Sequence, residues 1–159
     1  MKLLCPLYFK AIKLSNITPS PLLDLAIRLF MANIFFKSGW LRLQDFLNGT
    51  WENQIVAFTD YHPLPGIPPE IAAIAGTGAE IILPVLLVLG SLTRFSAAGL
   101  LIMTLSLQFL VPAEYGIAND DHYMWMMLLA VPMLKGAGIF SIDSLICRFG
   151  CRYWHKNNE

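Results

Sequence analysis

The residues of this chain that could carry chemistry are charged side chains placed inside apolar stretches. Asp24 and Arg28 stand four residues apart, one helical turn, and Glu80 lies in a later apolar stretch. Charged side chains at bilayer depth are costly, so they usually pair with one another or mark a functional site. At the helical rise, Arg28 and Glu80 would lie about 10 and 15 Å from the same membrane surface. The pattern therefore predicts a buried polar pocket in which Glu80 approaches Arg28, with Asp24 sharing the arginine.

Two interpretations of this pocket remain open. In the first, the buried charges fix the register of neighbouring helices. In the second, they form a polar site for a lipid headgroup, a quinone or a proton. Pro84 bears on both, because proline lacks the N–H that would bond the carbonyl of Glu80 in a helix. That carbonyl is then available to a donor or to water.

A second polar set is predicted near the outer membrane surface, and its candidate residues are Lys37, Gln108 and His122. Histidine changes its charge near neutral pH. The set is interpreted either as a solvated rim or as the entry point of a small acid or a proton relay. No metal site is predicted, since the histidines and acidic residues lack a tight spacing such as His-x-x-x-His.

Four apolar stretches must position these residues, and each approaches the ~20 residues that a helix needs to cross a bilayer. Hydrophobic residues make up 56% of the chain and charged residues 14%, whereas soluble domains carry about 25% charged residues. The net charge is zero, so no global field attracts nucleic acid. The chain is predicted to be an all-α membrane protein, a bundle of four transmembrane helices at about 21–40, 71–89, 95–111 and 120–135.

Lysine and arginine are sorted between the connections in a way that predicts an orientation. They gather before span one, between spans two and three, and after span four: Lys2, Lys10, Lys13, Arg94, Lys135, Arg148, Arg152 and Lys156. The other two connections are mainly acidic. Because lysine and arginine mark the cytoplasmic side, we expect a bacterial inner-membrane protein with both termini in the cytoplasm and an uncleaved first span.

The segments that flank the spans have predicted structures of their own. Residues 1–20 form a cytoplasmic N-terminal segment, and residues 136–159 form a cytoplasmic tail. Within the tail, Ser141 is a good N-cap for a short amphipathic helix that lies on the membrane surface. Trp51–Phe58 predicts a short interfacial helix in the first outer loop. The three cysteines are predicted to be cytoplasmic free thiols: Cys5, Cys147 and Cys151.

Several motifs, in order along about 22–145, resemble those of the DoxX family of small membrane proteins. The residues that carry the resemblance are Arg28, Gly39, Arg42, Glu80, Gly90, Arg94, Gly136, Gly138, Ser141 and Asp143. Three positions depart from the family pattern. Arg42 stands in place of its lysine, Ala137 in place of its usual proline and Ile142 in place of its usual leucine.

The resemblance implies a four-helix protein of the bacterial inner membrane, in a family whose members include subunits of thiosulfate:quinone oxidoreductase and partners of thiol and oxidative-stress proteins. We therefore expect a non-catalytic or quinone-contacting membrane subunit of a redox complex, with a soluble partner on the cytoplasmic side. The alternatives are a transporter for a small or lipid-linked solute, and an anchor that recruits a soluble partner. No nucleotide, haem or flavin motif is present, so a self-contained oxidoreductase is not predicted. The oligomeric state stays open.

Overall fold

The computed structural model describes residues 20–61, 63–111, 116, 118–136, 138 and 140–143, and all regular structure within them is helical. The elements are α2 (Ser20–Leu47), α3 (Glu52–Val56), the π-helix η1 (Ala57–Tyr61), α4 (Pro69–Leu89), α5 (Thr93–Phe109) and α6 (Asp120–Lys135). The all-α prediction is thus confirmed for the described chain. The predicted surface helix of the tail from residue 144 onward and the three cysteines lie outside the described residues.

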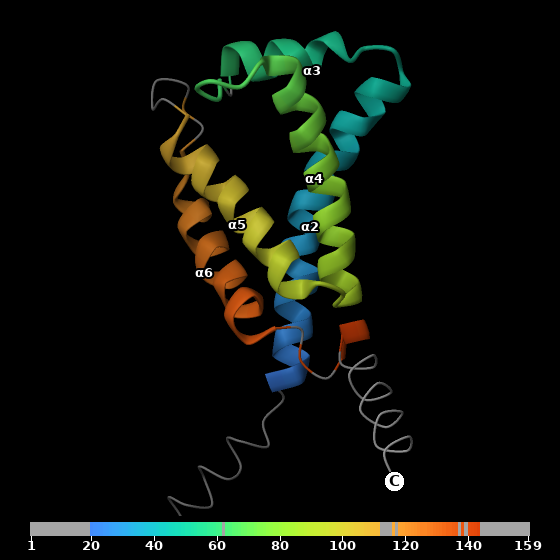
Figure 1. Cartoon of the computed structure of the whole chain (residues 1–159), viewed down its shortest axis with the longest axis vertical. Helices are drawn as coiled ribbons and strands as arrows, with labels where there is room; N and C mark the ends of the chain where they lie inside the picture. The colour runs from blue at the N-terminus through green and yellow to red at the C-terminus, as the bar shows by residue number, and fades with distance from the viewer. Residues whose placement is uncertain are drawn as a thin grey trace, which may run out of the picture.

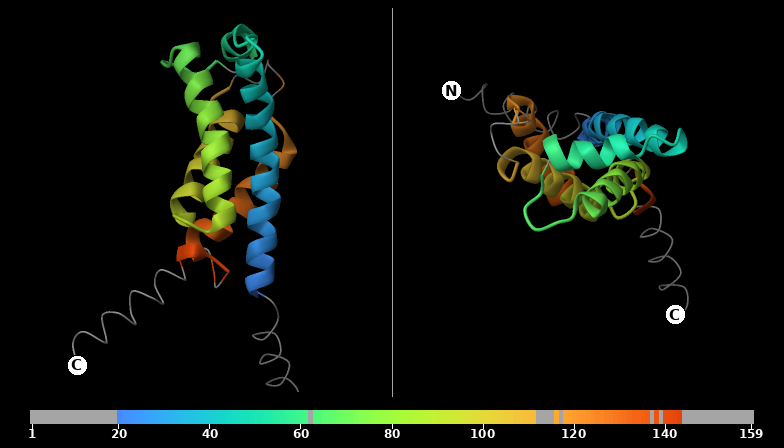
Figure 2. Two further views of the ribbon diagram at one scale, coloured as in Figure 1. Left: turned by 90° about the vertical axis from the view of Figure 1, so that its right-hand side faces the viewer. Right: turned by 90° about the horizontal axis from the view of Figure 1, so that it is seen from above.

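The four long helices form two antiparallel pairs, α2 with α4 and α5 with α6, which are joined by contacts between α4 and α5 (Figure 1). The described chain begins and ends at the lower end of Figure 1, where the α4–α5 turn also lies. The short α3 and η1 cross the opposite end (Figure 2). We call these the inner and outer ends, after the orientation that the charges predict.

Local sequence signals account for most helix ends. Pro68 is the N-cap of α4 and Pro69 its first residue, a position where the missing N–H costs nothing. Gly90 ends α4 in the left-handed conformation that glycine favours. The Asn119 side chain accepts a hydrogen bond from the N–H of Asp121 and caps α6. The expected helix at Trp51–Phe58 is present as α3 and the start of η1.

One boundary differs from the prediction by more than two residues. The first stretch was expected to end near Trp40, but α2 continues to Leu47 and has 28 residues. Gly39 does not end this helix, because it serves a packing role. A Cβ at Gly39 would lie 2.7 Å from the Cβ of Glu80, so this glycine lets α2 and α4 approach closely.

The side chains are distributed with polar groups inside the bundle and apolar groups outside it. Arg28 and Thr104 are 0% exposed, whereas Phe95, Met127 and Leu134 are 68%, 75% and 72% exposed. An apolar core lies between the helix pairs and consists of Met31, Phe35, Leu87, Ala97, Leu100 and Leu129. Such an extensive apolar exterior is not typical of a soluble monomer.

Length and composition qualify one described helix, α4, to cross a membrane. The helices α5 and α6 have 17 and 16 residues, somewhat fewer than the ~20 of a typical span. The helix α2 is long enough but carries Asp24, Arg28 and Lys37.

Candidate functional site

The buried charged residues and their partners form two separate clusters, one at the inner end and one at the middle of α4, where α2 packs against it. The inner-end cluster consists of Asp24, Arg28, Gly90, Lys135, Ser141 and Asp143. The mid-bundle site consists of Arg42, Phe58, Gly76, Thr77 and Glu80. The prediction placed Asp24, Arg28 and Glu80 in one pocket. All three side chains are buried, but Glu80 belongs to the mid-bundle site.

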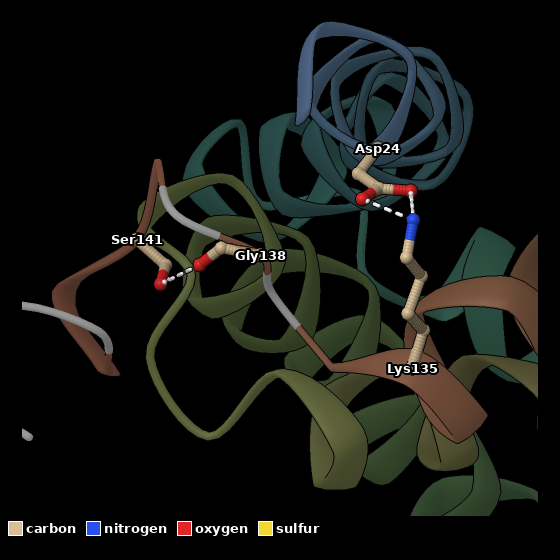
Figure 3. A network of polar contacts seen from close by, with 4 residues as sticks. All are labelled: Asp24, Lys135, Gly138 and Ser141. Atoms are coloured by element: carbon tan, nitrogen blue, oxygen red, sulfur yellow. Dashed lines mark hydrogen bonds and ion pairs between the residues drawn. The ribbon is translucent and has the colours of Figure 1, made fainter. Parts of the chain in front are cut away.

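The inner-end cluster ties the first and last described helices together. Lys135, in the last turn of α6, donates to both carboxylate oxygens of Asp24 at 2.9 and 2.7 Å (Figure 3). The Asp24 side chain is buried, while that of Lys135 is half-exposed. Gly138 lies against Asp24 and accepts a hydrogen bond of 2.7 Å from the Ser141 hydroxyl.

Arg28 holds the segment after α6 against the α4–α5 turn. Its Nη2 donates to the carbonyl oxygen of Phe140 at 2.6 Å. A side chain at Gly90 would collide with Nη1 of Arg28 and lie 2.5 Å from the Cβ of Ser141. Glycine is favoured at position 90 for two reasons. Its φ of 67° is a left-handed conformation, and there is no space for a Cβ between Arg28 and Ser141.

Asp143 caps a helix distant from it in the sequence. Its carboxylate accepts hydrogen bonds from the N–H of Leu92 at 3.1 Å and of Thr93 at 3.3 Å, at the start of α5. A negative charge at this position satisfies free N–H groups and complements the helix dipole. Asp143 N–H in turn donates to the carbonyl of Gly90 at 3.1 Å. The predicted tail residues Gly138, Ser141 and Asp143 therefore build the inner end of the bundle.

The mid-bundle site contains a correction to the predicted ion pair. Glu80 pairs with Arg42, whose Nη1 lies 3.2 Å from Oε2 of Glu80, and does not pair with Arg28. The cause is helix register. Gly39 faces Glu80, and Arg42 lies three residues further along α2. Arg28 is eleven residues before Gly39, about 16 Å away along the helix.

An apolar cavity of about 270 Å³ lies between α4 and α5, and Arg42 forms part of its wall. The other lining residues are mainly apolar, among them Phe58, Ala79 and Met103. Exposed Ile71 and Ile102 border it, so it opens on the apolar exterior. The guanidinium carbon of Arg42 lies 5.0 Å from the centre of the Phe58 ring, within the range of a cation–π contact.

Three buried polar atoms of the mid-bundle site make no hydrogen bond within the described structure: Nη1 of Arg42, Oε2 of Glu80 and Oγ1 of Thr77. The first two form the ion pair without hydrogen-bond geometry. Buried polar groups normally have hydrogen-bond partners. Of these three residues Arg42 lines the cavity, whereas Thr77 and Glu80 do not. The site therefore presents one buried donor group, the Arg42 guanidinium, in the wall of the cavity.

The three residues predicted to form the outer rim do not lie together. Gln108 and His122 come together at the outer end of α5 and α6, with Nδ1 of His122 2.8 Å from Oε1 of Gln108. Lys37 lies elsewhere, on the exposed side of α2 and two residues from Gly39. The remaining motif residue, Arg94, is exposed at the inner end, where its Nε lies beside Gly136.

Sequence reasoning missed the Arg42–Glu80 and Asp24–Lys135 pairs. The available signal for the first was Gly39, since a small residue in an apolar helix marks a close helix contact. Placing that contact opposite Glu80 would have selected Arg42 as the partner. No comparable local signal links Asp24 with Lys135, which are 111 residues apart.

A helical bundle with a charged interior and an apolar exterior is typical of membrane-associated proteins. The chain belongs to the DoxX family, whose family model matches residues 23–113. This confirms the resemblance carried by the motifs up to Arg94. A Haemophilus influenzae protein described as an uncharacterized protein is 35% identical over 140 residues, which cover 83% of this chain and 89% of that protein. No solved structure matches the chain.

Proposed function

We propose that this protein is a four-span membrane subunit of a redox complex and that it contacts a quinone in the cavity between α4 and α5. The observation that carries the proposal is the guanidinium of Arg42 in the wall of an apolar cavity, with its Nη1 buried and without a hydrogen-bond partner in the described structure. A quinone has the matching chemistry, because it combines an apolar body with carbonyl oxygens.

Each residue of the site has a role in this proposal. Nη1 of Arg42 donates a hydrogen bond to a quinone carbonyl. Glu80 does not line the cavity and holds the guanidinium in place through its ion pair. The apolar walls exclude water. At about 270 Å³ the cavity is slightly smaller than typical ligand pockets, so it suits a ring headgroup whose tail extends past Ile71 and Ile102 into lipid. Electrons come from a partner chain of the complex.

Quinone binding is tested with the purified protein and a short-tailed ubiquinone analogue, using quenching of tryptophan fluorescence. Trp51 packs against the cluster of Phe58, Ala72 and Ala73, and two of these residues, Phe58 and Ala72, line the cavity. Arg42→Gln should raise Kd about tenfold or more, because a hydrogen bond from a charged donor is lost. Ala75→Phe, which fills the cavity from an exposed wall position, should also raise Kd.

Arg94→Gln is the matched control for quinone binding, since it removes an arginine at the inner end, outside this cavity, and its Kd should equal that of the unaltered protein. Non-saturable quenching, or an unchanged Kd in both Arg42→Gln and Ala75→Phe, would exclude the proposed site.

The four-span arrangement is supported by the length of α4 and by the apolar side chains on the outside of the bundle. The 21 residues of α4 extend about 32 Å, close to the ~30 Å of a bilayer core. The helices α2 and α5 pack against α4, and α6 packs against α5 and α2. All three expose large apolar side chains. Slight local thinning of the bilayer accommodates the shorter α5 and α6. The charge sorting then orients the inner end, with both termini, toward the cytoplasm of a bacterial cell.

Single cysteines in a cysteine-free background test this topology in intact cells with a membrane-impermeant thiol reagent. Cysteines at Asn53 and Asn119, exposed at the outer end, should be labelled. A cysteine at Arg94, exposed at the inner end, should be labelled after the membrane is opened. Labelling of the Arg94 position in intact cells would reverse the orientation.

A further inference from the structure

We propose that the exposed face of α2 around Asn33 and Lys37, with the adjoining groove on α4, docks a transmembrane helix of a partner chain that brings a carboxylate to Lys37. The proposal rests on the four-span arrangement proposed above. It does not depend on quinone binding, because the α4–α5 cavity is lined by a different set of residues.

The depth of Lys37 is fixed by the contact between Gly39 and Glu80. Glu80 is ten residues from Gly90 and eleven from Pro69, so it marks the middle of α4 and of a bilayer that α4 crosses. Lys37 is two residues from Gly39, about 3 Å along α2. The Lys37 side chain therefore leaves α2 near the midplane. At this depth its ammonium group is farthest from both membrane surfaces, so the flexible side chain extends least effectively to either one.

Lys37 and Asn33 are exposed on the same side of α2, one turn apart. Within the described residues, Lys37 has no ion pair. An unpaired lysine that faces hydrocarbon at this depth is costly, and such residues almost always face protein or a water-filled cavity. The exposure of both polar residues in the single chain therefore indicates a face that is covered in the assembled complex.

The shape of this face suits a helix. Two adjoining hollows of about 360 Å³ each share Asn33 and Phe36. One continues over Pro84 and Val88 of α4, and the other over Lys37 to Trp40. Phe36 and Trp40 stack with their ring centres 6.2 Å apart and line the hollow that contains Lys37. A helix that packs here would accept a hydrogen bond from Asn33 and pair an acidic side chain with Lys37.

A second copy of this chain does not supply the required acid. Copies in the same orientation, related by a two-fold axis along the membrane normal, would place Lys37 against Lys37, and like charges repel. Glu80, the described carboxylate at this depth, is 2% exposed and paired with Arg42. The other described acids lie toward the two ends of the bundle. Charge complementarity thus selects a different chain with an intramembrane Asp or Glu.

The test is photo-crosslinking from a reactive amino acid at position 33 in native membranes, followed by mass spectrometry of the adduct. We expect a defined adduct with another chain whose apolar helix carries a central Asp or Glu. Lys37→Met should lower its yield about tenfold or more, while Lys37→Arg should retain it, because the charge persists. A reactive group at Ile74, exposed on α4 and outside both hollows, is the control and should not give this adduct.

The reciprocal change completes the test, since replacing the partner's acid with its amide should lower the yield as Lys37→Met does. Adducts with lipid alone, with a second copy, or with a helix that lacks an acid would each overturn the proposal, as would a yield that Lys37→Met leaves unchanged. Quinone binding should survive Lys37→Met, so failure of this proposal and failure of the quinone proposal are separate results.

Discussion

Glu80→Gln is expected to lower the free energy of unfolding by about 3–5 kcal/mol, because it leaves the Arg42 guanidinium without its buried counter-ion. The Glu80 side chain is 3% exposed and that of Arg42 is 15% exposed, so water replaces little of the lost interaction. The cation–π contact with Phe58 remains and favours the lower part of this range. Reversible unfolding in mixed detergent micelles, followed by helical circular dichroism, measures the change.

A double-mutant cycle identifies the partner of Glu80. Combining Glu80→Gln with Arg42→Gln should destabilise the protein less than the sum of the single changes, with a coupling of about 0.5–3 kcal/mol. Combining Glu80→Gln with Arg28→Gln is the matched control and should be additive within about 0.5 kcal/mol, since these side chains lie in separate clusters. Coupling of Glu80 to Arg28, with none to Arg42, would contradict the helix register described above.

Gly90→Ala is expected to destabilise the protein by about 2–5 kcal/mol. A left-handed backbone costs a residue with a Cβ about 1–2 kcal/mol, and overpacking adds about 1–3 kcal/mol. The new methyl group would displace Arg28 and Ser141 from the α4–α5 turn. Asp143 would then lose its hold on the first N–H groups of α5, and hydrogen exchange at Leu92 and Thr93 should accelerate.

Gly49→Ala separates the two contributions to the Gly90 effect. Gly49 has φ at 77°, similar to the 67° of Gly90, but nothing lies within 4 Å of a Cβ built there. We expect Gly49→Ala to cost about 1–2 kcal/mol, the conformational part alone, and to leave exchange at Leu92 and Thr93 unchanged. Equal losses for the two substitutions would show that the inner-end cluster tolerates the added methyl group.

The conformation of the α4–α5 turn connects these effects with the family pattern. Leu92 has φ at 50°, a left-handed conformation that is uncommon for leucine. Its N–H donates to Asp143, and the N–H of Thr93 donates to the same carboxylate. The Arg94 motif and the Gly136–Asp143 motif are thus in contact at the inner end. Asp143 stabilises the α4–α5 turn, in which Leu92 has a backbone conformation that leucine disfavours.

The sequence by itself determined the helices and most of their limits. Apolar stretches, Pro69 and Gly90 act within a turn or two of the chain, and such local signals can be read without tertiary contacts. They predicted α4 to within two residues and α6 over its full length. The charge content and the motifs also indicated the membrane class and the DoxX family, which the family match confirms over residues 23–113.

The tertiary structure alone decided which charges meet. Pairing between helices depends on their relative register, which is set where two backbones approach most closely. Here that contact is Gly39 against Glu80. It leaves Arg28 at the inner end, brings Arg42 to Glu80 and places Lys37 near the middle of α4. A shift of one turn between α2 and α4, about 5.4 Å, would bring a different residue of α2 to Glu80, while the hydrophobic pattern of each helix would look the same.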